Sequence, residues 1–392
     1  MPSKPHDVAI GYLRSVVTVL VLAHHAVLAY HPYAPPPQAS LSAWPQLWRA
    51  FPVVDAARWP GFAWLVGFND VFFMALMFFV SGLYAWRSLE RKGSAAFVAD
   101  RAVRLGLPFV AFALVIAPLA YYPAYLQTGA SPSLLAYAQE WLAASNWPTG
   151  PAWFLWVLLA FDCLAAGTYA LARGWVHARP FAVAARRPFV LFALLVAASG
   201  VAYVPLTFAI DPLHWTAAGP FVFQTDRLLH YAVYFFAGVV VGANRAEADV
   251  LAGDGRLARS WPVWVLLMAG AFALLTQSFL GAVSGSSTWA ATMPFAFVLS
   301  CAASSFGFLA VFVRFARTSR RALDDLRDNA YGMYVVHYAF SAWLQFALLG
   351  APLPGVAKGA LAVAGTIALS WSAVAALRRI RAVARVIGPA VA

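Results

Sequence analysis

Basic residues alternate from side to side of a ladder of apolar segments, and this pattern constrains the fold more than any other feature. A bilayer crossing needs about 20 apolar residues, and segments of that kind lie near residues 8–30, 62–86, 105–122, 151–172, 188–208, 229–244, 262–282, 290–313, 330–349 and 356–377. If the chain crosses at each, 22 of its 27 Lys and Arg residues, from Lys4 to Arg385, share the side of both termini. Only Arg49, Arg58, Arg227 and Lys358 fall on the other side, and Arg14 lies within a segment. The positive-inside rule therefore predicts an all-α polytopic membrane protein with about ten helices and cytoplasmic termini.

Composition excludes the soluble classes. Apolar residues make up 62% of the chain and charged residues 11%, whereas soluble domains average about half apolar and a quarter charged. The net charge of +12 does not indicate nucleic-acid binding, because the basic residues lie in short loops beside apolar segments. We expect one membrane domain over residues 1–392 without a cleavable signal peptide, since the first segment is span-length and carries Arg14. Cys163 and Cys301 fall in apolar segments, which predicts two buried thiols and no disulfide.

The first apolar segment carries two residues that can do chemistry, Arg14 and His25. Eleven residues of helix turn through about 1100°, roughly 20° past three full turns, so the two side chains share a face about 16 Å apart along the axis. A guanidinium binds phosphates through two parallel hydrogen bonds, and a neutral imidazole can take a proton from a hydroxyl. The neighbouring His24 points about 100° away from that face. The alternative is that Arg14 extends to lipid headgroups and the histidines only pack against polar neighbours.

Five stretches in register resemble the motifs of acyltransferase family 3, the integral-membrane O-acyltransferases of the bacterial type. The first is Arg14 with His25 after ten intervening residues, and the resemblance runs through nearly the whole chain. The other four are Phe78-Phe79-Val80-Ser81-Gly82-Leu83, Arg101-Ala102-Val103-Arg104, Gly150-Pro151-Ala152-Trp153-Phe154-Leu155, and Asn329-Ala330-Tyr331-Gly332-Met333-Tyr334-Val335-Val336-His337.

The resemblance implies transfer of an acyl group, usually acetyl, from a cytoplasmic acyl-CoA to a hydroxyl on a carbohydrate or other envelope molecule. It places the protein in the bacterial inner (cytoplasmic) membrane, with Arg14, Arg101 and Arg104 on the phosphates of acetyl-CoA or another acyl-CoA and His25 as the catalytic base. Residues three apart are neighbours on one α-helical face, so Arg101 and Arg104 should point together at the cytoplasmic end. Ordinary membrane anchoring explains this pair equally simply, because the whole 87–104 loop is basic.

Three further polar or aromatic positions are weaker site candidates. Asp70 lies about 12 Å, and His25 about 7 Å, below the outer ends of their helices, so Asp70 could orient or charge-stabilise the imidazole. An ion pair with Arg58 or a helix cap would explain Asp70 equally well. Glu140 and Trp153 could line an acceptor pocket because aromatic rings stack on sugars, although Trp residues at a membrane interface are common.

His337 is a candidate acceptor-site residue near Tyr331 and Tyr334, and its alternative is a packed, hydrogen-bonded core histidine. The chain has no GxxxxGK[ST], HExxH, CxxC or GxSxG motif, so no metal site is predicted. Two functions remain open: an acyltransferase, and a glycan or lipid transporter or flippase without acyl transfer. The absence of paired halves in the sequence favours the enzyme. The acceptor, the acyl group and the membrane face used for transfer stay open.

Overall fold

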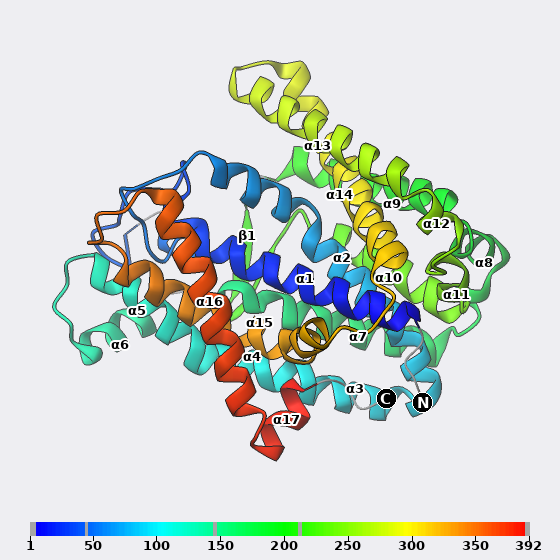
Figure 1. The fold of residues 1–392 in the computed structure, drawn as a ribbon, viewed down its shortest axis with the longest axis horizontal. Coiled ribbons are helices and arrows are strands. Elements are labelled where there is room, and N and C mark those ends of the chain that lie inside the picture. Colours follow the sequence, from blue (N-terminus) through cyan, green and yellow to red (C-terminus); the bar gives the residue numbers. More distant parts are fainter. Residues whose placement is uncertain (1–4, 44–45, 144–146, 211–213, 389–392) are drawn as a thin grey trace.

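Long helices form almost the whole molecule in the computed structural model, which describes residues 5–43, 46–143, 147–210 and 214–388 (Figure 1). Within those residues, eight helical segments are long and apolar enough to cross a membrane. These segments are Asp7–Tyr30, Gly61–Lys92, Ser94–Gln127, Gly150–Leu171, Pro188–Ala209, Trp261–Val283, Ser287–Phe315 and Gly355–Leu377. The predicted all-α polytopic membrane fold is therefore confirmed.

The two other expected crossings also coincide with helices. One is α10 (Leu228–Ala243), which at 16 residues is shorter than the eight. The other is α15 (Arg321–Ala347), whose first turns carry several charged residues. The number of crossings and the side of the termini stay predictions, and Lys4 lies outside the described residues.

The elements follow one another as a series of long helices joined by short ones. The long helices are α1 (Pro5–Val27), α2 (Gly61–Lys92), α7 (Trp153–Leu171), α9 (Pro188–Ala209), α10, α13 (Trp261–Val283), α14 (Ser287–Phe315), α15 and α16 (Gly355–Leu377). The short helices are α6 (Leu134–Ala143), α8 (Arg179–Ala185), α11 (Glu247–Val250), α12 (Arg256–Arg259) and α17 (Arg381–Ile387). Single 3₁₀ turns are η1 (Leu28–Tyr30), η2 (Leu47–Arg49), η5 (Gly150–Ala152) and η6 (Trp175–His177). A two-stranded antiparallel hairpin, β1 (Trp215–Ala218) and β2 (Phe221–Gln224), pairs Trp215 with Gln224.

The third expected crossing is one continuous helical segment in which two stretches have wider, π-helical turns. It runs through α3 (Ser94–Arg101), η3 (Ala102–Gly106), α4 (Leu107–Ala111), η4 (Phe112–Ile116) and α5 (Ala117–Gln127). π-Helical turns are rare and occur frequently at functional sites. Here the first one begins directly after Arg101.

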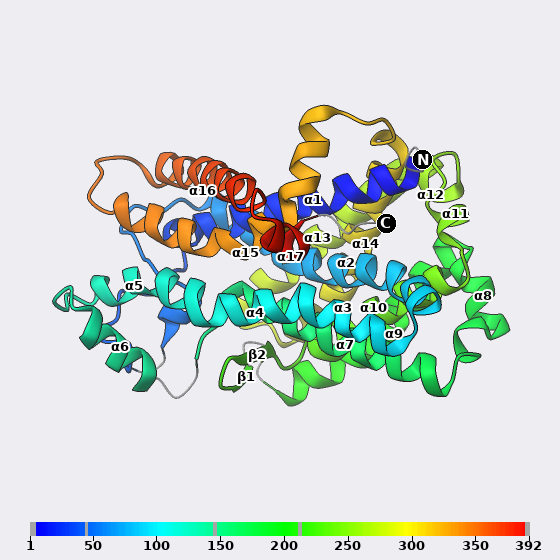
Figure 2. The same cartoon turned by 90° about the horizontal axis from the view of Figure 1, so that it is seen from below.

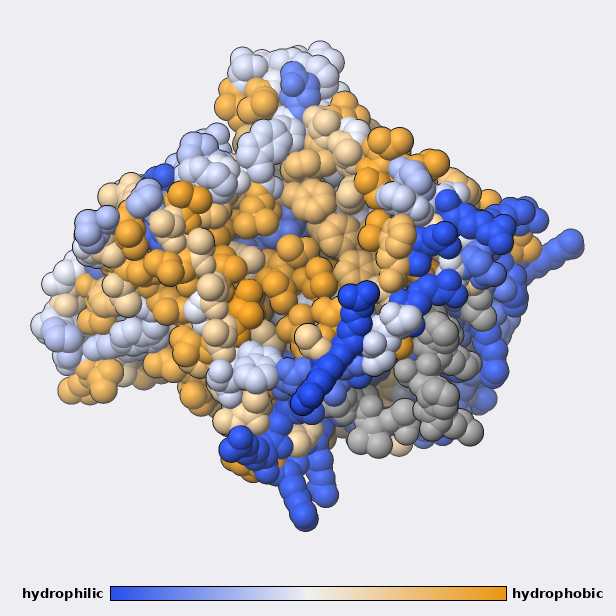
Figure 3. Space-filling model, in the orientation of Figure 1, coloured by the Kyte–Doolittle hydropathy of each residue, from blue (hydrophilic) through white to orange (hydrophobic). Residues whose placement is uncertain are grey.

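Helix α1 lies across the middle of the molecule and packs against α2, α14, α15 and α16 (Figures 1 and 2). Helices α13 and α14 run beside each other, and their connected ends project beyond the rest of the fold (Figure 1). Figure 3 shows apolar side chains over the middle of the visible face, with strongly hydrophilic ones gathered near α8 and α17. This distribution fits a molecule with a lipid-facing belt and one basic end.

Helices α2 and α10 cross with their backbones in contact, and three glycines make this possible. A Cβ atom on Gly82, Gly238 or Gly242 would lie 2.1 Å from a carbonyl oxygen of the opposite helix. Small residues commonly permit such close crossings in membranes. The glycine of the Phe78–Leu83 stretch is therefore required by packing.

The loop between α1 and α2 is fastened to α16 by a buried ion pair. Lys358 Nζ lies 2.7 Å from Asp55 Oδ2, with side chains only 3% and 4% exposed. Lys358 also donates to the carbonyl oxygen of Leu349, and Asp55 accepts from the amide of Ala57. Residues 55–57 of this loop are therefore anchored to α16.

The two cysteines differ in their surroundings. Cys301 is buried as predicted, whereas Cys163 is exposed, so the prediction of a second buried thiol is wrong. Helix α7 turns this position outward beside Leu164, which is 56% exposed. An apolar run does not by itself distinguish a lipid-facing position from a core position. Both thiols are free.

Candidate functional site

His25 contacts a second histidine from the other end of the chain. The His25 ring is partly buried near the end of α1, and its Nδ1 lies 2.9 Å from the carbonyl oxygen of Val21. The same Nδ1 lies 3.2 Å from Nε2 of His337. His337 is fully buried on α15, and its Nδ1 lies 2.6 Å from the carbonyl oxygen of Tyr334.

These contacts select one tautomer for each neutral ring. The carbonyl of Tyr334 can only accept, so the proton of His337 must be on Nδ1 and its Nε2 must be an acceptor. His25 Nδ1 then faces two acceptors, Val21 O and His337 Nε2, so it carries the proton. The remaining nitrogen, His25 Nε2, has an unprotonated lone pair and no hydrogen-bond partner within the described part of the chain. A group of this kind can act as a general base.

Helix α15 also holds the backbone around His25. Gln345 donates from Nε2 to the carbonyl oxygens of His25 (2.8 Å) and Ala26 (3.0 Å). These carbonyls lie in the last turn of α1, where no later helical amide can donate to them. The ring of Tyr338 meets the His25 ring edge-on at 5.3 Å between centroids. One element therefore fixes the position of the imidazole through three side chains.

The Gly150–Trp153 segment reaches this site through the same helix. Tyr334 donates its hydroxyl to the carbonyl oxygen of Pro151. A Cβ atom on Gly150 would lie 2.8 Å from the Tyr338 ring, and the residue has a φ of +44°, so two independent constraints require glycine. Two of the sequence stretches quoted above thus meet beside His25.

His24 turns its ring towards α2, while that ring still meets the His25 ring edge-on at 5.2 Å between centroids. Its ring packs against Phe73 of α2 at 5.4 Å, and its buried Nδ1 has no hydrogen-bond partner within the described residues. The geometry agrees with the expected divergence of the two histidines on α1.

The three predicted phosphate-binding arginines converge about three helical turns from His25. Arg14 keeps exposed surface and lies within electrostatic range of Arg101 and Arg104. The hydroxyls of Tyr84 on α2 and Tyr331 on α15 belong to the same cluster. Several guanidinium groups in one place can bind a phosphorylated ligand.

Arg101 and Arg104 point to different neighbours. Arg101 Nε lies 3.3 Å from Asp162 Oδ2 of α7, and its guanidinium covers the Phe97 ring. Arg104 donates to the carbonyl oxygen of Gly388, while its own carbonyl accepts from Tyr331. The wider π turn over residues 102–106 separates side chains that an α-helix would place on one face. The two arginines therefore approach Arg14 from different directions.

Asp70 pairs with Arg227 at the start of α10. Arg227 Nη2 lies 2.8 Å from Asp70 Oδ2, and Nη1 donates to the Asp70 carbonyl oxygen. Arg58, the partner considered from the sequence, donates to the carbonyl oxygens of residues 31, 32 and 34 instead. No hydrogen bond between Asp70 and His25 is present within the described residues. A role for Asp70 at the imidazole stays a prediction without a direct contact to support it.

Glu140 and Trp153 lie in separate neighbourhoods. Glu140, on α6, accepts from the amide of Leu41 in the loop between α1 and α2 at 3.4 Å. Trp153 stacks on Tyr231 of α10 with 5.5 Å between ring centroids and meets Trp215 of β1 edge-on at 6.1 Å. The Trp153 surroundings are an aromatic platform, whereas Glu140 fastens a loop.

Two features of the site were not predicted from the sequence. The His25–His337 contact joins residues 312 positions apart, and only the shared presence of a histidine in two motif stretches pointed to it. Asp162, the buried partner of Arg101, stands alone in an apolar segment, and an acidic residue at such a place was the available signal. No group of three or more His, Cys, Asp or Glu residues that could hold a metal occurs within the described ranges.

Comparison with known protein families gives one match. The model of a family described as an acyltransferase domain matches residues 7–375, nearly the whole chain. No curated protein and no solved structure matches the chain significantly.

Proposed function

The chain belongs to the acyltransferase domain family and is a multi-pass membrane acyltransferase, and we propose that it transfers an acetyl group from cytoplasmic acetyl-CoA to a hydroxyl of a cell-envelope carbohydrate. Another acyl-CoA could replace acetyl-CoA as donor without changing the chemistry at His25. The proposed location is the bacterial inner membrane, with the lipid bilayer around the helix bundle. Neither the family nor the geometry favours a transporter without acyl transfer.

The arrangement of His25 and His337 carries the proposal. The acceptor hydroxyl attacks the thioester carbonyl carbon while His25 Nε2 takes its proton. When the carbon–sulfur bond breaks, the thiolate leaves and recovers that proton from Nε2, so the imidazole returns to its starting state. His25 Nδ1–H stays hydrogen-bonded to His337 and Val21 throughout. His337 is thus a positioning residue that keeps the basic nitrogen turned towards the reacting groups.

The arginine cluster is the proposed donor site. Arg14, Arg101 and Arg104 would bind the diphosphate and the ribose phosphate of CoA through charge-assisted hydrogen bonds. Tyr331 holds the Arg104 backbone, and Asp162 holds Arg101. The separation of about 16 Å between Arg14 and His25 along α1 is the distance that the extended pantetheine arm has to cover.

The acceptor is proposed to bind near the Gly150–Trp153 segment. Trp153, Tyr231 and Trp215 form an aromatic platform of the kind on which sugar rings stack. Glu140 would act there only through the loop between α1 and α2 that it holds.

Labelled acetyl-CoA tests the reaction. Purified protein mixed with isolated envelope membranes should move the acetyl label into an envelope fraction. Unlabelled acetyl-CoA should dilute that incorporation more strongly than succinyl-CoA does. Release of free labelled acetate without labelled envelope product would contradict a hydroxyl acceptor of this class. Equal dilution by succinyl-CoA would contradict acetyl as the preferred group.

A further inference from the structure

A cavity of about 250 Å³ lies on the side of α1 away from the donor arginines. Its walls come from Tyr12, from the last turns of α14 at Val311, Phe312 and Phe315, and from Leu323 at the start of α15. Tyr12 precedes Arg14 by two residues, about 200° around the helix, so the cavity is not part of the arginine cluster. Phe315 at the rim is 60% exposed, so the apolar walls continue to the outer surface of the bundle.

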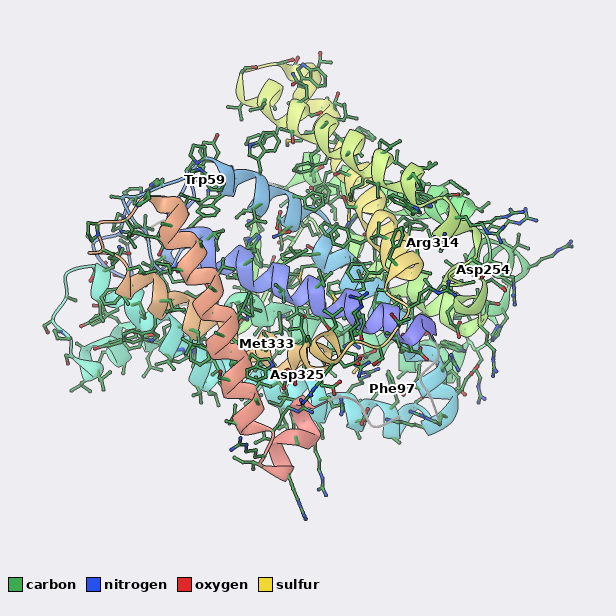
Figure 4. All side chains as sticks on the ribbon, viewed as in Figure 1. Trp59, Phe97, Asp254, Arg314, Asp325 and Met333 are labelled. Carbon is green, nitrogen blue, oxygen red and sulfur yellow. The ribbon has the colours of Figure 1, made fainter. Side chains whose placement is uncertain are left out.

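Four arginines lie within eight residues of sequence beside this apolar space, and two of them, Arg314 and Arg317, are turned towards Gly253. Arg314, Arg317, Arg320 and Arg321 are all exposed, and Arg320 itself lines the cavity. No ion pair joins any of them to a carboxylate within the described chain. Figure 4 labels Arg314 at the end of α14 from which the linker leads to α15. The rim therefore carries positive charge without internal compensation.

The carboxylate of Asp324, next to Tyr12 in the cavity wall, already has partners. Asp324 accepts from the Tyr12 hydroxyl at 2.8 Å and from the Ser319 hydroxyl, and it pairs with Arg327 at 3.0 Å. Tyr12 also accepts from the Arg320 amide at 2.8 Å. The linker between α14 and α15 is consequently held in place as a firm edge of the cavity.

We propose that this cavity binds an anionic phospholipid, with an acyl chain between Phe312, Phe315 and Leu323 and the headgroup phosphate on Arg320. The apolar walls of the cavity reach the surface of the helix bundle, and Arg320 lies at its edge. This combination fits a ligand with an acyl chain and an anionic headgroup. Charge complementarity supplies the headgroup contact, because guanidinium groups bind phosphate oxygens bidentately. Phosphatidylcholine also carries a phosphate, but its ammonium group cancels that charge, so the basic rim should favour a lipid with a net negative headgroup. The proposal is independent of the acyl-transfer reaction.

Photocrosslinking maps the occupant directly. The full-length protein is reconstituted in phosphatidylcholine nanodiscs with a trace of phosphatidylglycerol that carries a diazirine in its acyl chain, and the labelled peptides are identified by mass spectrometry. Labels should concentrate on residues 311–323, and excess unlabelled phosphatidylglycerol should remove them. Labelling spread evenly over the apolar surface, or equal labelling by a phosphatidylcholine probe, would overturn the proposal.

A matched charge comparison separates this site from general attraction to the membrane. The variant Arg320→Gln should reduce labelling of residues 311–323 about tenfold or more, the effect of losing one charge-assisted hydrogen bond. The control Arg385→Gln removes the same charge from α17 and should leave that labelling unchanged. Equal losses in the two variants would show non-specific attraction and contradict the site. Displacement of the label by CoA instead of by phosphatidylglycerol would assign the cavity to the donor and also overturn the proposal.

Discussion

His337 gives the His25 ring one preferred tautomer, a role that a neutral imidazole fills here instead of a carboxylate. The Tyr334 carbonyl holds the His337 proton on Nδ1, so His337 Nε2 is left to accept from His25 Nδ1. A neutral partner has a consequence for the chemistry. It orients the base but adds no negative charge beside it, so catalysis should depend on geometry more than on electrostatic stabilisation of an imidazolium.

Removing the acceptor on His337 should therefore slow the chemical step. His337→Phe should lower kcat about tenfold, the effect of one lost hydrogen bond of roughly 1.4 kcal/mol, while the KM for acyl-CoA stays close to that of the parent. His337→Gln retains an oxygen that can accept from His25 Nδ1 and should recover most of the rate. Steady-state kinetics in membranes with matched protein levels measures both. A parental kcat in His337→Phe would contradict the positioning role.

The arginine cluster predicts a different kinetic signature. Arg14→Ala and Arg104→Ala should each weaken acyl-CoA binding, because each lost charge-assisted contact is worth roughly 1.5–3 kcal/mol. Arg14→Lys should restore binding only in part, since an ammonium group lacks the two-pronged geometry. Titration of a fluorescent CoA analogue gives the dissociation constants. Unchanged affinity in both alanine variants would remove these residues from the donor site.

Residue types and helical periodicity predicted part of this site. The angle between Arg14 and His25 follows from residue spacing alone, and the separate surroundings of His24 agree with it. The partners of Asp70 and Arg101 do not follow, because Arg227 and Asp162 come from other helices, and no local pattern specifies which helices pack together. The His25–His337 contact required tertiary structure for the same reason.

At the scale of elements, the α2–α10 crossing is the packing contact that tolerates least change. Gly238→Ala would place a Cβ atom 2.1 Å from the Phe79 carbonyl oxygen, so one helix must move. We expect a loss of about 1–3 kcal/mol, the usual cost of overpacking, and a lower melting temperature in detergent. In Gly200→Ala, at a helical position with no atom within 4 Å, the higher helix propensity of alanine should leave stability equal or slightly raised. Equal melting temperatures for the two variants would contradict the close crossing.

The sequence pattern predicts that the helices exist but not the irregular turns within them. All ten apolar segments coincide with helices, because length and hydrophobicity are local properties. The two π-helical turns in the third segment insert extra backbone between flanking α-helical stretches. Gly106 and Pro108 mark an irregularity beside the first turn, because proline removes a helical hydrogen bond, but they do not specify a π turn. The altered direction of Arg104 relative to Arg101 follows from that undetected turn.

At the scale of the whole molecule, the uneven distribution of basic residues predicts its orientation in the membrane. Ala96→Cys lies at an exposed position of helix α3, and Ser131→Cys lies at an exposed position between α5 and α6. In a background with Cys163→Ala and Cys301→Ala, an impermeant maleimide should label position 131 in intact cells and position 96 only after permeabilisation. Labelling of position 96 from outside would invert the orientation and place the arginine cluster away from cytoplasmic CoA.

The central claim is that His25 Nε2 is the base, and the adjacent histidine provides its control. His25→Ala should insert normally and still bind CoA, yet lose acetyl transfer by about 10²–10⁴-fold, the usual contribution of a positioned general base. His24→Ala removes the same side chain one residue away, on the face towards Phe73, and should keep most of the activity. The deciding measurement is the rate of acetyl transfer for both variants at matched membrane levels. A parental rate in His25→Ala, or equal losses in the two variants, would contradict the account.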